Sequence, residues 1–150
     1  MIHAFSHGLA DAVAPLLALL ALLNPAIRPS LGDRSTVWRY LAAAALGVAG
    51  IYLVAGLDVW LGLWSRAGLD YSTHTAFVTT LAVSLGRSRP GWAWALVAVV
   101  LLYSLLIFAL GFHGLGDIVT SAIVAAAVTP PQRPKNWSRF PSGSRTPKDR

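Results

Sequence analysis

Long apolar stretches alternate with short polar segments along most of the chain. Apolar residues dominate five stretches, at residues 9–27, 37–60, 72–86, 92–112 and 114–129. One helical crossing of a bilayer takes about 20 residues, so five crossings fit into this length. The third stretch is short and rich in Thr and Ser, which favours a helix that faces other helices more than lipid. The pattern predicts an all-α fold, a polytopic membrane helix bundle of about five transmembrane helices within residues 1–129.

Residues 130–150 have a different composition, rich in Pro, Ser and basic residues with almost no apolar ones. A segment of this kind cannot bury enough apolar surface to fold by itself. We therefore expect a disordered basic cytoplasmic tail that lies on the anionic inner leaflet and takes no part in catalysis.

The composition of the whole chain supports the membrane class. Apolar residues make up 55% of the 150 residues and charged residues only 12%, which is about half the charge of an ordinary soluble domain. The chain has no cysteine, which excludes disulfides, thiolate metal sites and cysteine nucleophiles.

The basic residues predict the orientation of the bundle. Five spans place alternate connections on opposite sides, and eleven of the twelve Lys and Arg residues then fall on one side, with only Arg66 on the other. Because Lys and Arg concentrate on the cytoplasmic side, we expect the N-terminus outside and the C-terminus inside the cytoplasmic membrane. The net charge of +6 is then an orientation signal, and no nucleic-acid partner is expected.

Ionisable residues near the outer ends of the spans are the candidates for chemistry, because their insertion into a membrane is costly. These residues are Asp58, Asp70, His74, His113 and Asp117. We interpret Asp58 and Asp70 as helix-end or N-cap residues, with Asp70 capping the third helix.

The other three candidates open two helices that run in the same direction. His74 opens the third helix, and His113 and Asp117 open the fifth, so both N-termini face one outer pocket and favour an anion such as phosphate. His113 and Asp117 are four residues apart and would share a helix face. The carboxylate would then fix the imidazole tautomer and leave the other nitrogen free as a nucleophile or base, with His74 as a general acid.

Two short sequences, YSTHTAF and HGLGD, carry these residues, and their histidines are 39 positions apart. They resemble the second and third signature motifs of the type 2 phosphatidic acid phosphatase superfamily, over about residues 70–128. The resemblance implies that His113 attacks the phosphorus to form a phosphohistidine, that Asp117 orients His113 and that His74 protonates the leaving alcohol. It implies neither a metal nor a cofactor. The residues expected to bind the substrate are Tyr71, Ser72, Thr73 and Arg66.

The chain departs from the family pattern at its arginines. Leu106 and Ile107 stand where the third motif has Ser-Arg, and the first motif, K-x6-R-P, is absent ahead of His74. Arg66 is therefore the one cation expected on the outer side, in partial replacement of the missing arginines.

These observations lead to an integral membrane phosphatase, a metal-independent phosphoric monoester hydrolase acting at the outer face. Its substrate would be a lipid phosphate, either a polyprenyl or a glycerolipid phosphate, held among membrane lipids. Two alternatives stay open: a lipid phosphotransferase that uses the same triad, and a non-catalytic family member that binds lipid headgroups or a membrane partner.

Small residues in the second span, Ala43 with Gly47 and Ala45 with Ala49, allow close approach of another helix. They would suit a homodimer or packing within the chain.

Overall fold

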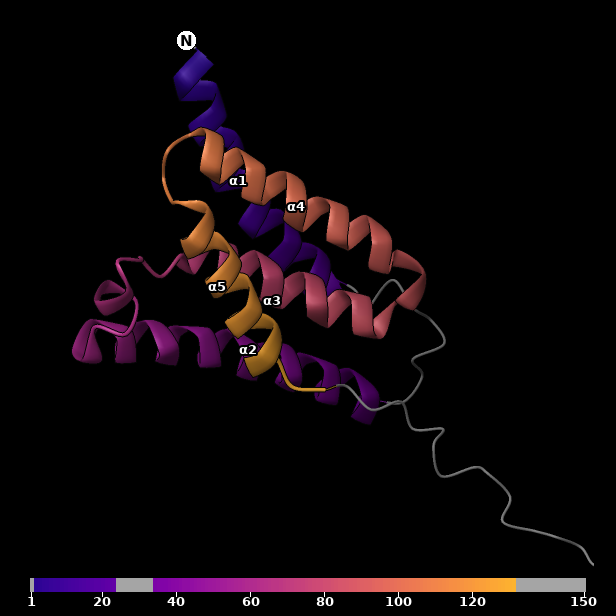
Figure 1. Ribbon diagram of the computed structural model, residues 1–150. Coiled ribbons are helices and arrows are strands. Elements are labelled where there is room, and N and C mark those ends of the chain that lie inside the picture. The colour runs from indigo at the N-terminus through magenta and orange to yellow at the C-terminus, as the bar shows by residue number, and fades with distance from the viewer. Residues whose placement is uncertain (1, 24–33, 132–150) are drawn as a thin grey trace, which may run out of the picture.

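The computed structural model describes residues 2–23 and 34–131, and these ranges consist of helices joined by short loops, without a strand (Figure 1). The helices are α1 (Ile2–Leu23), α2 (Arg34–Leu61), α3 (Thr73–Ser88), α4 (Ala93–Ala109) and α5 (Leu115–Val128). Two short 3-10 turns, η1 (Ser65–Ala67) and η2 (Pro90–Trp92), precede α3 and α4. The predicted all-α class is confirmed for these residues, while almost all of the predicted tail lies outside them.

Each of the five predicted stretches overlaps one helix, but their ends differ. The first helix already begins at Ile2 and is described to Leu23, so the predicted residues 24–27 lie outside the described part. α4 ends at Ala109, short of the predicted residue 112, because the chain turns at Gly111 with a φ of 71°. That left-handed conformation is one that glycine adopts without strain.

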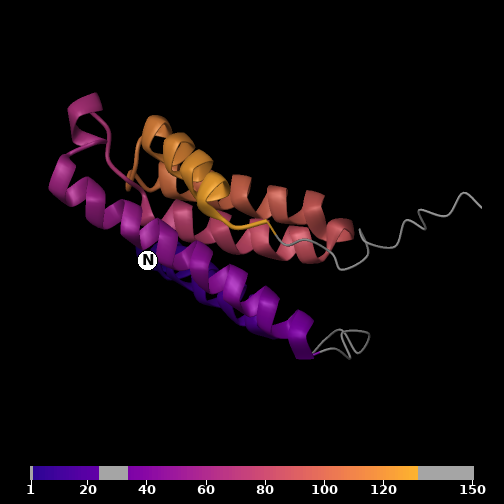
Figure 2. The ribbon, with the colours of Figure 1, turned by 90° about the horizontal axis from the view of Figure 1, so that it is seen from below.

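α3 is the central helix, and each of the other four helices packs against it (Figure 2). Around it, α2 contacts α5, α5 contacts α4, and α4 contacts α1. α1 and α2 both pack on α3 but scarcely on each other. The ring of helices around α3 is therefore open between α1 and α2.

α3 and α5 run parallel, as contacts at both of their ends establish. At one end, the backbone N–H of Asp70, just ahead of α3, donates to Asp117 in the first turn of α5. At the other end, Arg87 Nη1 in the last turn of α3 donates to the carbonyls of Thr129 and Pro130, at 2.6 Å and 2.8 Å. The expectation that these two helices begin at the same end of the bundle is confirmed.

Two apolar clusters hold the helices together. The larger one joins α1, α3, α4 and the start of α5, and includes Leu17, Leu85 and Ile107. The smaller one joins α2, α3 and α5 around Ile51 and Ala125, and it also takes in Tyr71 from the loop before α3. Through Tyr71, this second cluster reaches the loop before α3 that also carries Asp70.

Gly47 brings α2 close to α3 and α5. A Cβ atom at this position would lie 2.9 Å from Thr80 Cγ2 and 3.5 Å from Thr129 Cγ2. Gly47 is therefore used for packing within the chain, whereas Ala45 and Ala49 are exposed.

Two segments are long and apolar enough to cross a membrane, Val37–Leu61 of α2 and Pro90–Ala109 of η2 and α4. Most of their side chains are exposed, including the large apolar residues Leu53, Val59, Trp60, Trp94, Leu101, Leu102 and Leu105. A helix in the core of a soluble protein would bury such side chains. These two segments suggest that the protein associates with a membrane.

The glycine contact in α2 can be tested with a matched pair of substitutions. Gly47→Ala should lower the free energy of unfolding by about 1–3 kcal/mol, because the new methyl group overlaps Thr80. Gly56→Ala in the same helix is the control, since a Cβ there would meet nothing within 4 Å. Thermal unfolding followed by circular dichroism measures both, and equal midpoints for the two variants would contradict the close packing of α2.

Candidate active site at the start of two parallel helices

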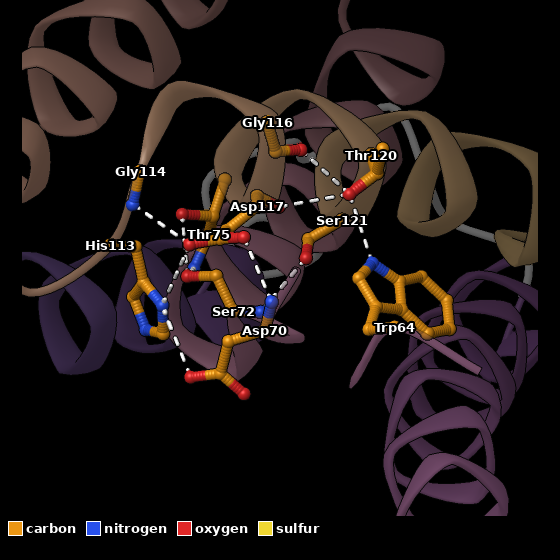
Figure 3. A network of polar contacts seen from close by, with 10 residues as sticks. All are labelled: Trp64, Asp70, Ser72, Thr75, His113, Gly114, Gly116, Asp117, Thr120 and Ser121. Atoms are coloured by element: carbon orange, nitrogen blue, oxygen red, sulfur yellow. Dashed lines mark hydrogen bonds and ion pairs between the residues drawn. The ribbon is translucent and has the colours of Figure 1, made fainter. Parts of the chain in front are cut away.

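The loop segment directly ahead of α3 is fixed to the first two turns of α5 by two hydrogen bonds (Figure 3). The N–H of Asp70 donates to Asp117 Oδ1 and the N–H of Ser72 donates to Ser121 Oγ, each at 2.8 Å. Two residues of chain span at most about 7 Å, and four residues of helix rise about 6 Å. The two acceptors on α5 thus match the two donors in spacing.

The same segment approaches α5 closely because residue 116 is glycine. A Cβ atom on Gly116 would lie 2.7 Å from Leu69 Cδ2. The absence of a side chain there lets Leu69 pack on the first turn of α5, next to the Asp70 bond.

Trp64 connects the loop that follows α2 to α5 and to Tyr71. Its Nε1–H donates to Thr120 Oγ1 at 2.9 Å, and its ring meets the Tyr71 ring edge-on with centroids 4.7 Å apart. Its backbone N–H donates to Asp58 Oδ1 at 2.8 Å. Asp58 therefore serves as a helix-end residue, as expected.

His113 lies in the turn before α5. The prediction that His113 and Asp117 share a helical face is wrong, because α5 begins at Leu115 with Gly114 as its N-cap. Asp117 Oδ2 accepts the Gly114 N–H at 2.8 Å, and this bond closes the turn. The turn, rather than helical periodicity, brings the imidazole next to the carboxylate.

The Nδ1 atom of His113 faces two carboxylates. It lies 3.6 Å from Asp70 Oδ2 and 3.9 Å from Asp117 Oδ2, both beyond ordinary hydrogen-bond distance. The nitrogen is buried and has no hydrogen-bond partner among the described residues. Two acceptors on this side favour a proton on Nδ1, which leaves the lone pair of a neutral imidazole on Nε2.

The interpretation of Asp70 as the cap of the third helix is wrong. The N-cap of α3 is Ser72, whose Oγ accepts the Thr75 N–H at 3.3 Å and donates to Thr75 Oγ1 at 2.9 Å. The Asp70 carboxylate is directed instead toward His113, and the sequence reasoning missed this pairing.

Two of the expected substrate-binding residues are occupied by structural contacts. Ser72 is fully buried, with its N–H bound to Ser121 and its hydroxyl bound to Thr75. Tyr71 is also buried, against Trp64. In this conformation neither the hydroxyl nor the N–H of Ser72 is available to hold a phosphate oxygen.

His74 and Thr73 line a cavity of about 510 Å³ in the opening between α1 and α2. Its other lining residues are Ala14, Pro15 and Ala18 of α1, Tyr52 of α2 and Phe77 of α3. His74 is exposed in this cavity. Within residues 2–23 and 34–131, no hydrogen bond or ion pair joins it to His113 or Asp117.

Arg66 lies in η1, and its side chain is exposed. In the described part of the chain its guanidinium forms neither a hydrogen bond nor an ion pair. The structure therefore does not bring it to the histidines by a direct contact.

Comparison of this chain with protein-family models, with curated proteins and with solved structures returns no match. The family resemblance therefore rests on the two sequence motifs alone.

The bond between Ser72 and Ser121 should contribute measurably to stability. Ser121→Ala leaves the buried N–H of Ser72 without an acceptor and should cost about 1–3 kcal/mol of unfolding free energy. Ser84→Ala is the matched control, because Ser84 is equally buried but its hydroxyl has no partner among the described residues. Chemical denaturation compares the two variants, and an equal effect of both would contradict a special role for Ser121.

Tyr71 should make stability depend on pH in the alkaline range. Burial raises the pKa of Tyr71 from 10.0 to about 12. The folded state therefore favours the neutral phenol, and the associated stability is complete below pH 10 and lost as the pH rises from 10 through about 12. Tyr71→Phe should unfold with the native midpoint at pH 8, because the hydroxyl has no partner in the described residues.

Between pH 10 and 12 the Tyr71→Phe variant should keep stability that the native protein loses. Parallel alkaline titrations of both proteins, followed by circular dichroism, would disagree with this assignment if they showed the same loss.

Proposed function

We propose that this protein is an integral membrane phosphatase that hydrolyses a lipid phosphate through a phosphohistidine on His113. The observation that carries the proposal is the position of the His113 imidazole relative to two carboxylates. Its buried Nδ1 faces two carboxylates at the common starting end of α3 and α5. An imidazole held in this way presents Nε2 as a nucleophile and accommodates the positive charge that develops when Nε2 attacks.

In the first step, Nε2 of His113 attacks the phosphorus and forms an N–P bond while the bond from phosphorus to the lipid oxygen breaks. The electron pair of that bond goes to the alcohol oxygen, which takes a proton from the imidazolium of His74. His74 stands in the first turn of α3, at the same end of the bundle as His113. A phosphate bound between His74 and His113 would link the two side chains, because catalytic contacts often tighten only when substrate is bound.

In the second step, water attacks the phosphorus of the phosphohistidine and the N–P bond breaks. The electron pair returns to Nε2, and neutral His74 takes a proton from the water. Inorganic phosphate leaves and both histidines regain their starting state. A lipid alcohol in place of water would make the same site a phosphotransferase.

A lipid substrate fits the surroundings of His74. The cavity is lined mainly by apolar side chains from α1 and α3, including Pro15 and Phe77. Its polar groups come from Tyr52, Thr73 and His74. Such a space suits a hydrocarbon chain whose phosphate extends toward the polar residues. Because the ring of helices is open between α1 and α2, the hydrocarbon chain of the lipid would remain in the bilayer.

The membrane placement proposed from the sequence accounts for the helix lengths. α2 has 28 residues and can cross a bilayer of about 30 Å with excess length. α3 and α5 have 16 and 14 residues, or about 24 and 21 Å. Short helices that begin below the end of α2 would set the site within the depth of the lipid headgroups, on the outer side according to the distribution of basic residues.

A non-catalytic lipid-binding role is the second candidate, and two observations favour it. Arg66 is exposed without a partner in the described residues, and Ser72 is buried in structural bonds. Phosphoryl transfer depends on cationic or N–H donors that neutralise the developing charge. A site with few such donors suits headgroup binding without turnover.

Phosphate release tests the proposed reaction. The detergent-solubilised protein should release inorganic phosphate from a polyprenyl phosphate or phosphatidic acid, also in the presence of a chelator. His113→Ala should lower the rate by at least about a hundredfold, because the nucleophile is removed. Val119→Ala, an exposed position on α5, the helix that follows His113, is the matched control and should keep the native rate.

The covalent intermediate gives an independent measurement. A substrate labelled in its phosphate should leave an acid-labile label on the native protein and none on the His113→Ala variant. Equal phosphate release by the native protein and the His113→Ala variant would contradict the phosphatase assignment. Saturable binding of the lipid phosphate without release or labelling would favour the non-catalytic candidate.

A further inference from the structure

We propose that Asp70, rather than Asp117, is the carboxylate that orients the imidazole of His113, and that Asp117 acts mainly as a clamp between two loops. Asp70 is then a positioning residue, because it would act on the substrate only through His113. Its importance for catalysis rests on the proposed function, whereas its effect on the imidazole does not.

The two carboxylates differ in what else they bind. Asp117 accepts the N–H of Asp70 on Oδ1 and the N–H of Gly114 on Oδ2, each at 2.8 Å. Both of its oxygens are thus committed to the backbone at good hydrogen-bond distance. The Asp70 carboxylate forms no hydrogen bond among the described residues, and its one ion-pair contact is with His113.

Distance and direction also favour Asp70. Its Oδ2 lies 3.6 Å from His113 Nδ1, compared with 3.9 Å for Asp117 Oδ2. In Figure 3 the carboxylate of Asp70 lies on the side of the imidazole away from α5, with a dashed line to Nδ1. The Asp70 oxygen, free of other partners, can shorten this contact to a hydrogen bond, whereas the bonds of Asp117 to Gly114 and Asp70 restrict how far its carboxylate can move toward Nδ1.

Asp117 acts on His113 indirectly, through its hydrogen bond to the backbone of Asp70. By holding the Asp70 N–H, Asp117 fixes the position from which the Asp70 side chain reaches the imidazole. The Ser72 bond to Ser121, two residues further on, fixes the other side of the segment. The Asp70 side chain is 76% exposed, but these two backbone hydrogen bonds fix the position from which it extends.

The tautomer of neutral His113 is the decisive readout, because a structural role of Asp70 would leave it unchanged. Nitrogen-15 NMR of the full chain in detergent micelles, labelled at its four histidines, distinguishes the Nδ1–H from the Nε2–H form. The spectrum is recorded near pH 9, and the His113 signal is assigned by its loss in His113→Gln. The native protein should show the Nδ1–H form as the major species.

In Asp70→Asn, the Nδ1–H form should no longer be the major tautomer of His113. The unfolding temperature should not fall, because the Asp70 side chain is mostly exposed. Asp70→Glu should restore part of it, because the longer side chain still carries a carboxylate. Asp117→Asn should lower the unfolding temperature, because an amide replaces one of two backbone acceptors. Arg66→Gln, a charge change at the same end of the bundle without contact to His113, is the control and should leave the tautomer as it is.

An unchanged tautomer in Asp70→Asn, or its loss in Asp117→Asn without loss of stability, would overturn the assignment. Activity separates this proposal from the proposed function. If the native protein releases phosphate, Asp70→Asn should lower kcat by about tenfold or more with KM within about twofold. If the native protein releases none while the tautomer still responds to Asp70, the phosphatase proposal fails and the role of Asp70 stands.

Discussion

The site depends on the attachment of one loop segment, residues 69–72, to the first two turns of α5. Two backbone N–H groups two residues apart meet two side-chain acceptors four residues apart, Asp117 and Ser121. A loop ahead of a central helix has to satisfy its backbone groups, and here α5 supplies the acceptors. The match fixes where α3 begins, and with it the positions of Asp70 and His74 relative to His113.

Sequence reasoning predicted the helices well because long apolar stretches identify them strongly. It also predicted that α3 and α5 begin at one end, which followed from counting crossings. His113 and Asp117 were expected together on a helix, and they do lie together, but a turn closed by Gly114 brings them there. Their proximity was predictable from spacing, while the conformation that produces it depends on hydrogen bonds within the turn.

The roles of Ser72 and Asp70 could not be predicted, because both depend on contacts distant in sequence. Ser72 and Ser121 are 49 positions apart, and Asp70 and Asp117 are 47 apart. A motif shows which side chains are present, but not whether a hydroxyl is buried in a cap or open to a ligand. One signal was available in retrospect: Gly116, Asp117, Thr120 and Ser121 form a small and polar face on an otherwise apolar helix.

The helices around α3 are held by two different kinds of contact. The hydrogen bonds between elements join the loop before α3 and the end of α3 to α5, while the described part of α1 is held through apolar packing. Displacing the described part of α1 would therefore disturb non-directional contacts, and would leave intact the hydrogen bonds that attach the loop before α3 to α5. The packing of α1 and the geometry around His113 are therefore set by different kinds of interaction, apolar contacts for α1 and hydrogen bonds to α5 for the loop that carries Asp70.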